Sequence, residues 1–316
     1  MKTTKQVKRR PTIGISRDEW LQLRRQTVGG SDAAGIIGLS KWATPYTVWA
    51  DKTWRLPNKK DTEAMRLGRD LEDYVARRWM EETGKKVRRL NAMLYNPAYP
   101  FSHADIDRMV IGEEAGLECK TTSTLDVKQF KGVVFPEKYY AQCVHYMAVT
   151  GAERWYLAVL VFGSGFFTYT LERDQAEIDA LMAAEEDFWR TYVMPDTPPV
   201  PDGSDVTADA LQTIYADGQD RQVELFGRAP MLEEYARLKD QRKALDGRLS
   251  EIENIIKGDM QEAEHAVCGN CAITWKTQER SSFSQTDFYR DYPGIDLSPY
   301  YKTTRSRVFR VNTAKM

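Results

Sequence analysis

The sequence lacks any segment that would carry the chain into or across a membrane. No apolar run in its 316 residues approaches the length that spans a bilayer, and the basic N-terminus is not followed by the apolar stretch of a secretory signal. Charged residues make up 29% of the chain, as in a soluble protein. We therefore expect a cytoplasmic protein that does not contact membranes.

Cysteine is scarce, and its pattern argues against both a disulfide framework and a structural zinc site. The four cysteines are Cys119, Cys143, Cys268 and Cys271, and without a secretion signal they indicate a reducing compartment. Cys268 and Cys271 form one CxxC pair, and His265 is the only histidine near it. Three ligands at most are too few for a structural zinc, which needs four. We predict a tight turn between two strands at this pair instead.

The sequence also lacks internal repeats, low-complexity tracts and a large net charge of either sign. The formal net charge is −1, which neither supports nor excludes a nucleic-acid partner, because a balanced total can hide a local basic channel. A chain of this length can form one large domain or a domain with an appendage. Residues 1–15 are expected to be a basic, flexible arm that helps to hold a polyanion.

The stretch with the clearest indication of a reactive site runs from residue 103 to residue 122. Its pattern predicts two short strands joined by a turn. Alternation along the second strand places Glu118 and Lys120 on one face. The hairpin would bring Asp107 beside Glu118, and Asp105 lies on the same face as Asp107. Carboxylates and an ammonium on a strand edge form a poor core. They form a good site for a hard divalent cation and a water that is to be deprotonated.

Periodicity and capping residues predict further helices and strands before residue 195. Ser16 and Glu19 have the spacing of a capping box at the start of the first helix. The third helix is amphipathic, and its expected core face includes Met65, Leu67 and Tyr74. Helices are predicted at residues 16–25, 44–52, 63–82, 137–150 and 174–193, and strands at residues 86–95, 154–161 and 165–171.

A change of composition marks the end of this region. Residues 196–205 are rich in Pro, Asp, Gly and Ser, as in a linker or a long loop. Beyond them, apolar residues recur at spacings of three, four and seven, which predicts a heptad-like helix over residues 231–260 that only Arg242 interrupts. Such a helix suits an antiparallel partner or a short coiled coil. Two short strands are predicted further on, at residues 272–275 and 308–311.

A second polar group precedes another helix. Gly29 and Gly30 before Ser31 leave free backbone N–H groups around a small hydroxyl, an arrangement that favours an anion. Arg24, one or two helical turns earlier, could offer a bidentate guanidinium to the same anion. A capped helix after a flexible turn also explains the motif, and because glycine-serine turns are common, the motif alone favours that structural interpretation.

Taken in order, these motifs resemble the PD-(D/E)xK nuclease superfamily, and more closely its YqaJ-like viral recombinase and lambda exonuclease family. The resemblance covers roughly residues 17–195. It rests on residues 20–24, 29–32, 68–72, 104–108, 116–122 and 140–142 with 147–151. It implies an α/β (α+β) fold with a restriction-endonuclease-like core at residues 16–195, in which helices flank a central mixed β-sheet. A C-terminal accessory region with a helix and short strands would follow at residues 206–316.

The resemblance also implies a role for individual residues. The family's catalytic residues fall on Asp107, Glu118, Lys120, Glu72 and Gln142. Its metal ligands fall on Asp107, Glu118, Glu72 and the backbone carbonyl of Cys119, and its 5′-phosphate site falls on Arg24, Ser31 and Gly30. The family often has Pro or Asn before its Asp and Gly after it, whereas Ile106 and Arg108 flank Asp107 here. Asp105 therefore stays open as a rival or additional ligand.

The function that the resemblance implies is a DNA exonuclease of a phage or a bacterial host, with two Mg²⁺ ions that Mn²⁺ could replace. It would resect double-stranded ends 5′→3′ and expose 3′ strands for a single-strand annealing recombinase, as a ring-shaped trimer. Two alternatives stay open. One is a nickase or restriction-like endonuclease on the same core, and the other is a non-catalytic DNA-binding or scaffold protein built around the helix at residues 231–260.

Overall fold

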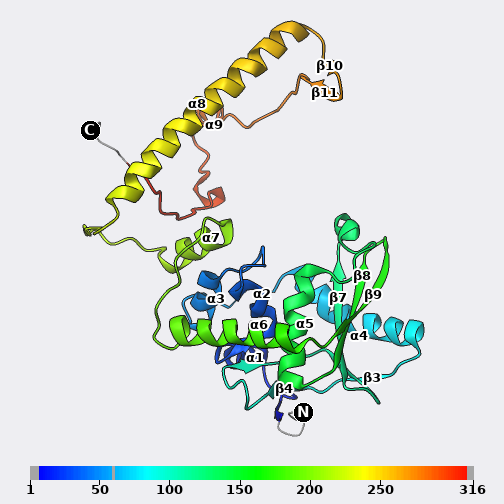
Figure 1. The fold of residues 1–316 in the computed structure, drawn as a ribbon. Coiled ribbons are helices and arrows are strands. Elements are labelled where there is room, and N and C mark those ends of the chain that lie inside the picture. The colour runs from blue at the N-terminus through cyan, green and yellow to red at the C-terminus, as the bar shows by residue number, and fades with distance from the viewer. Residues whose placement is uncertain (1–6, 59–60, 312–316) are drawn as a thin grey trace. The chain divides into compact units, whose positions relative to one another are not determined.

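The computed structural model describes residues 7–58 and 61–311, with the side chains of residues 124–126 left aside (Figure 1). The chain divides into two units, one that ends at Ala216 and one that begins at Asp217. The first unit contains the central sheet and every residue of the expected site. The second unit is built around one long helix.

A five-stranded mixed sheet forms the centre of the first unit, in the order β3-β6-β7-β8-β9. Strand β7 pairs antiparallel with β6 and parallel with β8, and β9 pairs antiparallel with β8. The predicted mixed sheet and the predicted hairpin are thus confirmed. The strands of this sheet are β3 (Val87–Arg88), β6 (Arg108–Val110), β7 (Ala115–Thr122), β8 (Arg154–Val161) and β9 (Gly165–Glu172).

Helices cover both faces of this sheet. Successive side chains along a strand point to opposite faces, and both faces are buried. On one face, Trp79 of α4 packs with Tyr156 and Leu117. On the other face, Met147 of α5 packs with Trp155, the residue before Tyr156. The helices of this unit are α1 (Arg17–Arg25), α2 (Gly30–Ile36), α3 (Pro45–Lys52), α4 (Glu63–Thr83), η2 (Thr124–Gln129), α5 (Glu137–Thr150), α6 (Gln175–Phe188), η3 (Trp189–Val193) and α7 (Asp205–Ile214).

Three sequence predictions in this unit are wrong in detail. Residues 86–95 form two strands, β3 and β4 (Ala92–Tyr95), because the backbone turns at Asn91, whose φ is 47°. Strand β1 (Lys8–Pro11) pairs with β4, so that part of the expected flexible arm is ordered in a strand, while residues 1–6 lie outside the described residues. The remaining strands are β2 (Val28–Gly29) and β5 (Ser102–His103), which pair in parallel.

The third discrepancy concerns α4. Met65, Leu67 and Tyr74 are 38%, 38% and 43% exposed, and only Val75, Ala76 and Trp79 are buried. Residues of the second half of the helix pack in the apolar cluster with the sheet, whereas Met65, Leu67 and Tyr74 are exposed. Periodicity identified the helix correctly but overestimated the length of its buried face.

The first unit continues past the expected linker at residues 196–205. Helix α7 packs beside α3, and the hydroxyl groups of Thr207 and Thr44 lie 2.9 Å apart in the interior. Ala210 joins the same apolar cluster as Trp49. The chain therefore divides after Ala216.

The second unit confirms the long helix and the cysteine turn. Helix α8 (Ala229–Met260) spans the predicted heptads, and β10 (His265–Cys268) pairs with β11 (Cys271–Thr274) so that the two cysteines face each other across the turn. Gly269 takes the positive φ of 57° that such a turn requires. The strand predicted at residues 308–311 is wrong, because no regular structure follows η4 (Ser298–Tyr300) in the described residues. A short helix, α9 (Gln285–Asp291), precedes η4.

No helix in the described part of the chain combines the length and the apolar character needed to cross a bilayer.

Two glycines allow a test of the sheet packing. A Cβ on Gly116 in β7 would lie 2.2 Å from Cη2 of Trp155, whereas a Cβ on Gly68 in α4 would meet nothing closer than Thr121 Oγ1 at 3.8 Å. We expect Gly116→Ala to destabilise the fold by about 1–3 kcal/mol through overpacking. The matched variant Gly68→Ala should stabilise it by about 0.5–1 kcal/mol, because Gly is unfavourable within a helix. Urea unfolding measures both, and equal effects would contradict the tight sheet contact.

Candidate active site

The edge of β7 carries the acidic cluster because β6 stops early. Strand β6 pairs with β7 only through Arg108 opposite Leu117 and Met109 opposite Gly116, so the next position along places Asp107 opposite Glu118. The backbone N–H of Cys119 has no strand partner there, and it donates to Asp107 Oδ2 at 2.7 Å. Asp107 and Glu118 are therefore held side by side on one face of the sheet.

Lys120 and Gln142 complete this cluster. Lys120 Nζ lies 2.5 Å from Glu118 Oε1 and comes from the same face of β7. Gln142, on α5, donates from Nε2 to Glu118 Oε1 at 2.9 Å and to the hydroxyl of Tyr146 at 2.8 Å. The Tyr146 hydroxyl donates in turn to the carbonyl of Asp105. The sequence prediction placed Tyr146 on the inner face of its helix but not at the site, although its spacing of four from Gln142 was a usable signal.

Glu72 reaches the cluster from α4, but it is paired. Arg108, whose side chain is 4% exposed, donates to Glu72 Oε1 and, at 2.6 Å, to Asp73. Arg89 lies 3.5 Å from the same Glu72 oxygen. The sequence presented Arg108 only as a departure from the family pattern. In the structure it is the cation that ties the start of β6 to α4.

Burial and mutual repulsion perturb the three central groups. Burial and the charges of Glu118 and Glu72 raise the pKa of Asp107 well above its usual value. Burial also raises the pKa of Glu118, although Lys120 opposes the shift. Burial alone would lower the pKa of Lys120, but the Glu118 and Asp107 carboxylates outweigh it and raise that pKa. The neighbouring carboxylates therefore keep Lys120 protonated as an ammonium. A general base would need a lowered pKa, which these groups do not provide.

The oxygen atoms of this cluster fit a hard divalent cation. Glu118 Oε2 is buried without a hydrogen-bond partner, and the half-buried Asp107 carboxylate interacts with Glu118. A Mg²⁺ ion is usually bound by one or two carboxylates, with water and phosphate oxygens completing its octahedron. Among the described residues, no three His, Cys, Asp or Glu side chains form a preformed metal cage. The donor set therefore fits two carboxylate ligands from the protein, and ligation by Glu72 and the Cys119 carbonyl stays a prediction.

Asp105 and Asp107 face different partners, which separates the two rivals. Burial raises the pKa of Asp105, while Arg24 and a hydrogen bond from Trp20 oppose this shift. The partners of Asp107 are instead the backbone of β7 and the charges of Glu118 and Lys120. Asp107 therefore belongs to the acidic cluster, and Asp105 lies near both Arg24 and this cluster, since its charge also raises the pKa of Glu118.

Arg24, Ser31 and Gly30 meet in the structure as the motif suggested. Helix α2 begins at Gly30, and the guanidinium of Arg24 donates from Nη2 to the Ser31 hydroxyl. Arg24 stacks on Trp20 at 4.7 Å, and its Nε is buried without a partner. These residues and the acidic cluster line one cleft of about 530 Å³. An oxyanion in this cleft would meet Arg24 Nε and the Ser31 hydroxyl together.

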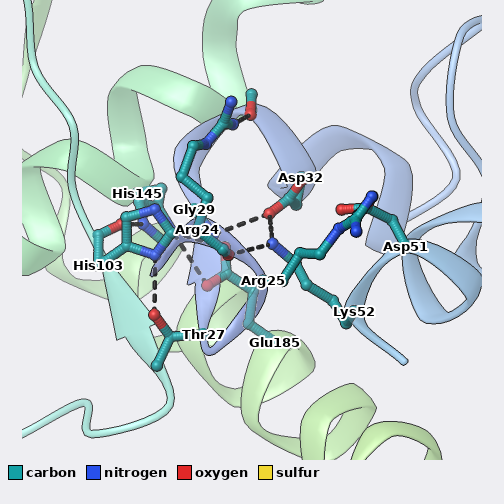
Figure 2. A network of polar contacts seen from close by, with 11 residues as sticks. Arg24, Arg25, Thr27, Gly29, Asp32, Asp51, Lys52, His103, His145 and Glu185 are labelled. Atoms are coloured by element: carbon teal, nitrogen blue, oxygen red, sulfur yellow. Dashed lines mark hydrogen bonds and ion pairs between the residues drawn. The ribbon is translucent and has the colours of Figure 1, made fainter. Parts of the chain in front are cut away.

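A buried ion pair that the sequence prediction missed supports this turn (Figure 2). Lys52, whose side chain is 1% exposed, lies 2.6 Å from Asp32 Oδ2 and donates to the carbonyl of Arg24 at 2.8 Å. Asp32 Oδ2 also accepts the N–H of Gly29. Burial would raise the pKa of Asp32, but Lys52 and Arg24 outweigh it and lower that pKa to about 2. Lys52 thus joins the end of α1 to the start of α2.

The two glycines of the turn are needed for packing. A Cβ on Gly29 would lie 2.9 Å from the His103 ring, and one on Gly30 would lie 2.6 Å from Cε1 of Tyr146. His103 is fully buried beside Thr27, with 2.8 Å between Nδ1 and the hydroxyl, and the ring of His145 bonds to its carbonyl (Figure 2). The turn therefore lies directly against the wall of the cleft. The sequence interpretation that stressed free N–H groups missed this constraint.

Comparison with known proteins agrees with these motifs. Residues 19–153 match the YqaJ-like viral recombinase domain. Over 301 residues, the chain is 38% identical to the protein YqaJ of Bacillus subtilis, described as uncharacterized, and the alignment covers 94% of this chain and 93% of that protein. The chain belongs to the YqaJ family. The family to which the motif order pointed is thus confirmed.

Two solved structures are similar to this YqaJ-family protein. One is the alkaline exonuclease LHK-Exo of Laribacter hongkongensis, at 25% identity and a TM-score of 0.48, covering 55% of this chain and 91% of that chain. The other is a phage related exonuclease of Haemophilus somnus, at 12% identity and a TM-score of 0.43, covering 56% of this chain and 100% of that chain.

The Asp32–Lys52 pair should make the stability of this YqaJ-family protein depend on pH. The pKa of Asp32 falls from 3.8 to about 2 on folding, so the carboxylate stabilises the fold above pH 4, and this contribution is lost as the pH falls toward 2. We expect the stability difference between the wild type and Asp32→Asn to shrink by about 2 kcal/mol over that range. Urea unfolding at pH 2–6 measures it, and a difference independent of pH would contradict the shifted carboxylate.

Proposed function

We propose that this YqaJ-family protein is a Mg²⁺-dependent deoxyribonuclease that hydrolyses double-stranded DNA from its ends, 5′→3′. One observation carries the proposal: the carboxylates of Asp107 and Glu118 share a cleft with Lys120 and with the cationic Arg24–Ser31 group. A cleft with carboxylate oxygens at one end and a guanidinium at the other suits a phosphodiester substrate. Hydrolysis of that substrate needs a metal ion, and the guanidinium can hold a phosphate in position. The viral recombinase description of the family supports DNA as the substrate.

Each residue of the cleft has a defined task in this proposal. A bound Mg²⁺ would supply Lewis-acid polarisation of the scissile phosphate and a more acidic water. Asp107 and Glu118 hold the ion, with Glu72 as a further ligand if Arg108 releases it. Gln142 fixes the Glu118 carboxylate through its 2.9 Å hydrogen bond. Lys120 orients the attacking water and opposes the negative charge that grows on the phosphate.

The Arg24–Ser31 group supplies the direction of digestion in this proposal. The free Nε of Arg24 and the Ser31 hydroxyl would bind a terminal phosphate, and both line the same cleft as the carboxylates. If the bound phosphate is the 5′ end of the cleaved strand, hydrolysis removes nucleotides 5′→3′ and leaves a 3′ single strand. That product is the substrate of a single-strand annealing recombinase, which we propose as the partner. A ring-shaped trimer, expected from the family resemblance, would keep such an enzyme on its DNA.

Digestion of end-labelled linear and covalently closed circular duplexes, with Mg²⁺ or with EDTA, tests the proposal. We expect degradation of the linear duplex with Mg²⁺, loss of the 5′ label first, and no hydrolysis with EDTA. The circular duplex should stay intact because it has no end. Cleavage of the circle would identify an endonuclease, and hydrolysis in EDTA would exclude the metal-dependent mechanism.

Substitution of Lys120 locates that activity in the cleft. Lys120→Ala should lower the rate by about 10²-fold or more, since a positioned charge or proton donor contributes about that much. DNA binding should persist, because Arg24 and the rest of the cleft are intact. Lys86→Ala, which removes an exposed lysine outside the cleft, is the matched control and should leave the rate unchanged. Equal rates for the two variants would remove this site from the mechanism.

Asp105 offers a test of the phosphate site, because its carboxylate interacts electrostatically with the Arg24 guanidinium. Duplexes with a 5′-phosphate should be degraded faster than dephosphorylated ones, and Arg24→Ala should bring this rate ratio close to one. Asp105→Asn removes a carboxylate that competes with the phosphate for Arg24, so it should raise the ratio above the wild-type value. Rates on paired phosphorylated and dephosphorylated substrates give both results. A loss of all hydrolysis in Asp105→Asn would assign Asp105 to the metal ion instead.

A further inference from the structure

Helix α8 in the second unit carries a regular apolar seam. With Tyr235 at a heptad position a, the residues at a and d alternate at spacings of three and four along the helix. This spacing keeps all of them on one side of the helix. The d positions are Met231, Leu238, Leu245 and Ile252, and the a positions are Tyr235, Arg242, Leu249 and Ile256.

The seam is open to solvent in the single chain. Six of its apolar side chains are between 36% and 65% exposed, and Met260 is the single buried residue on α8. An apolar stripe of about seven turns at this exposure is far larger than the scattered apolar residues of an ordinary surface. The rest of the described second unit does not cover it, so its occupant comes from elsewhere.

We infer that the occupant is α8 of a second copy of this chain, in a parallel two-stranded coiled coil. The charges that flank the seam match this arrangement, since position g of one helix meets the following e of the other. Glu234 would face Lys239 of the partner subunit, and Arg248 would face Glu253 of the partner subunit. By symmetry each pair occurs twice, and no like charges meet at these flanks.

An antiparallel pair is less complementary. The antiparallel register that keeps the whole seam in contact sets Leu238 against Leu249 and brings e positions to e and g to g. Lys239 then meets Asp246 of the partner subunit, and Glu234 and Arg248 find uncharged neighbours. The flanks of the parallel arrangement therefore carry twice as many opposite charges, and such pairs select orientation and partner.

Arg242 at a central a position favours two strands. In a dimer, the long stem of an a-position arginine can cover the seam while its guanidinium reaches solvent at the side. Asp246, four residues on, lies on that side and can accept the charge. A third helix would close this exit and bury the guanidinium groups together. A single polar residue at a is the usual device for fixing register and strand number, at some cost in stability.

The mass of the full chain in solution tests the pairing. The wild-type particle should have a mass in light scattering that is an even multiple of the 36.3 kDa chain mass. Leu249→Glu places a charge in the seam and should halve that mass. This result is expected whether or not the first units also associate. Ser250→Glu adds the same charge at the adjacent b position, outside the seam, and should keep the wild-type mass. A mass that Leu249→Glu leaves unchanged, or divides by three, overturns the inference.

A cysteine in the seam tests the orientation. In a chain with Cys268→Ser and Cys271→Ser, the variant Leu238→Cys sets two thiols across a parallel seam, and mild oxidation should link the chains on a non-reducing gel. In the antiparallel register the same two positions lie about 16 Å apart along the helix, beyond disulfide reach. Asp240→Cys, at an outward f position, is the control and should stay unlinked. An absent link in Leu238→Cys overturns the parallel arrangement.

The flanking charges can be tested by exchange. Arg248→Glu sets two acids against each other and should weaken dimerisation several-fold in sedimentation equilibrium. The double variant Arg248→Glu/Glu253→Arg restores opposite charges across the seam and should recover most of the wild-type affinity. A double variant as weak as the single one would overturn the role of this pair. Since every change lies in the second unit, outside the cleft of the first unit, failure of these tests leaves the proposed nuclease unaffected.

Discussion

Two like charges set directly opposite each other at the end of a hairpin are the constraint on which the first unit depends. Residues opposite each other on antiparallel strands have Cβ atoms about 5 Å apart, and like charges there are destabilising. Asp107 directly precedes the first paired position of β6 and lies beside Glu118, which is buried, while Asp107 is half-buried. Each neighbouring interaction offsets part of this cost: the Cys119 N–H binds Asp107, and Lys120 and Gln142 bind Glu118. The remaining unpartnered oxygen of Glu118 is where a cation would complete the balance.

Local patterns were enough to predict the centre of the site. A period of two along β7 and a hairpin of short connection place Asp107, Glu118 and Lys120 together, because every contact involved lies within about one hairpin. The helix that carries Gln142 followed from periodicity, and its place at the site came from the family resemblance. The roles of these residues came from family resemblance, since an acid–acid–lysine set alone also describes an exposed ion-paired strand.

Contacts between distant segments could not be predicted in this way. The pairing of β1 with β4 and the packing of Thr207 on Thr44 join segments whose sequences carry no mutual signal. The Lys52–Asp32 pair is of the same kind, since a helical lysine is most often an exposed charge. The strand expected at residues 308–311 failed for the opposite reason. Its β-branched and aromatic residues favour a strand, but intrinsic propensity alone does not form a strand without a neighbouring strand to pair with.

Arg108, which departs from the family pattern, and Asp105, the rival ligand, change the distribution of charge around Asp107. Where the family often has a small residue after its Asp, Arg108 joins the start of β6 to Glu72 and Asp73 of α4. Asp105 lies on the other side of Asp107 and faces Arg24. An added cation thus restrains one acid of the cluster, and an acid lies near Arg24, the arginine expected to hold a phosphate. The acidic end of the cleft thus already holds the ion pairs Arg108–Glu72 and Lys120–Glu118, with which a metal ion must compete, while Arg24 interacts with the nearby charge of Asp105. Binding in such a cleft is weaker than in an unpaired one, but it is selective for ligands whose charge exceeds that of the group displaced.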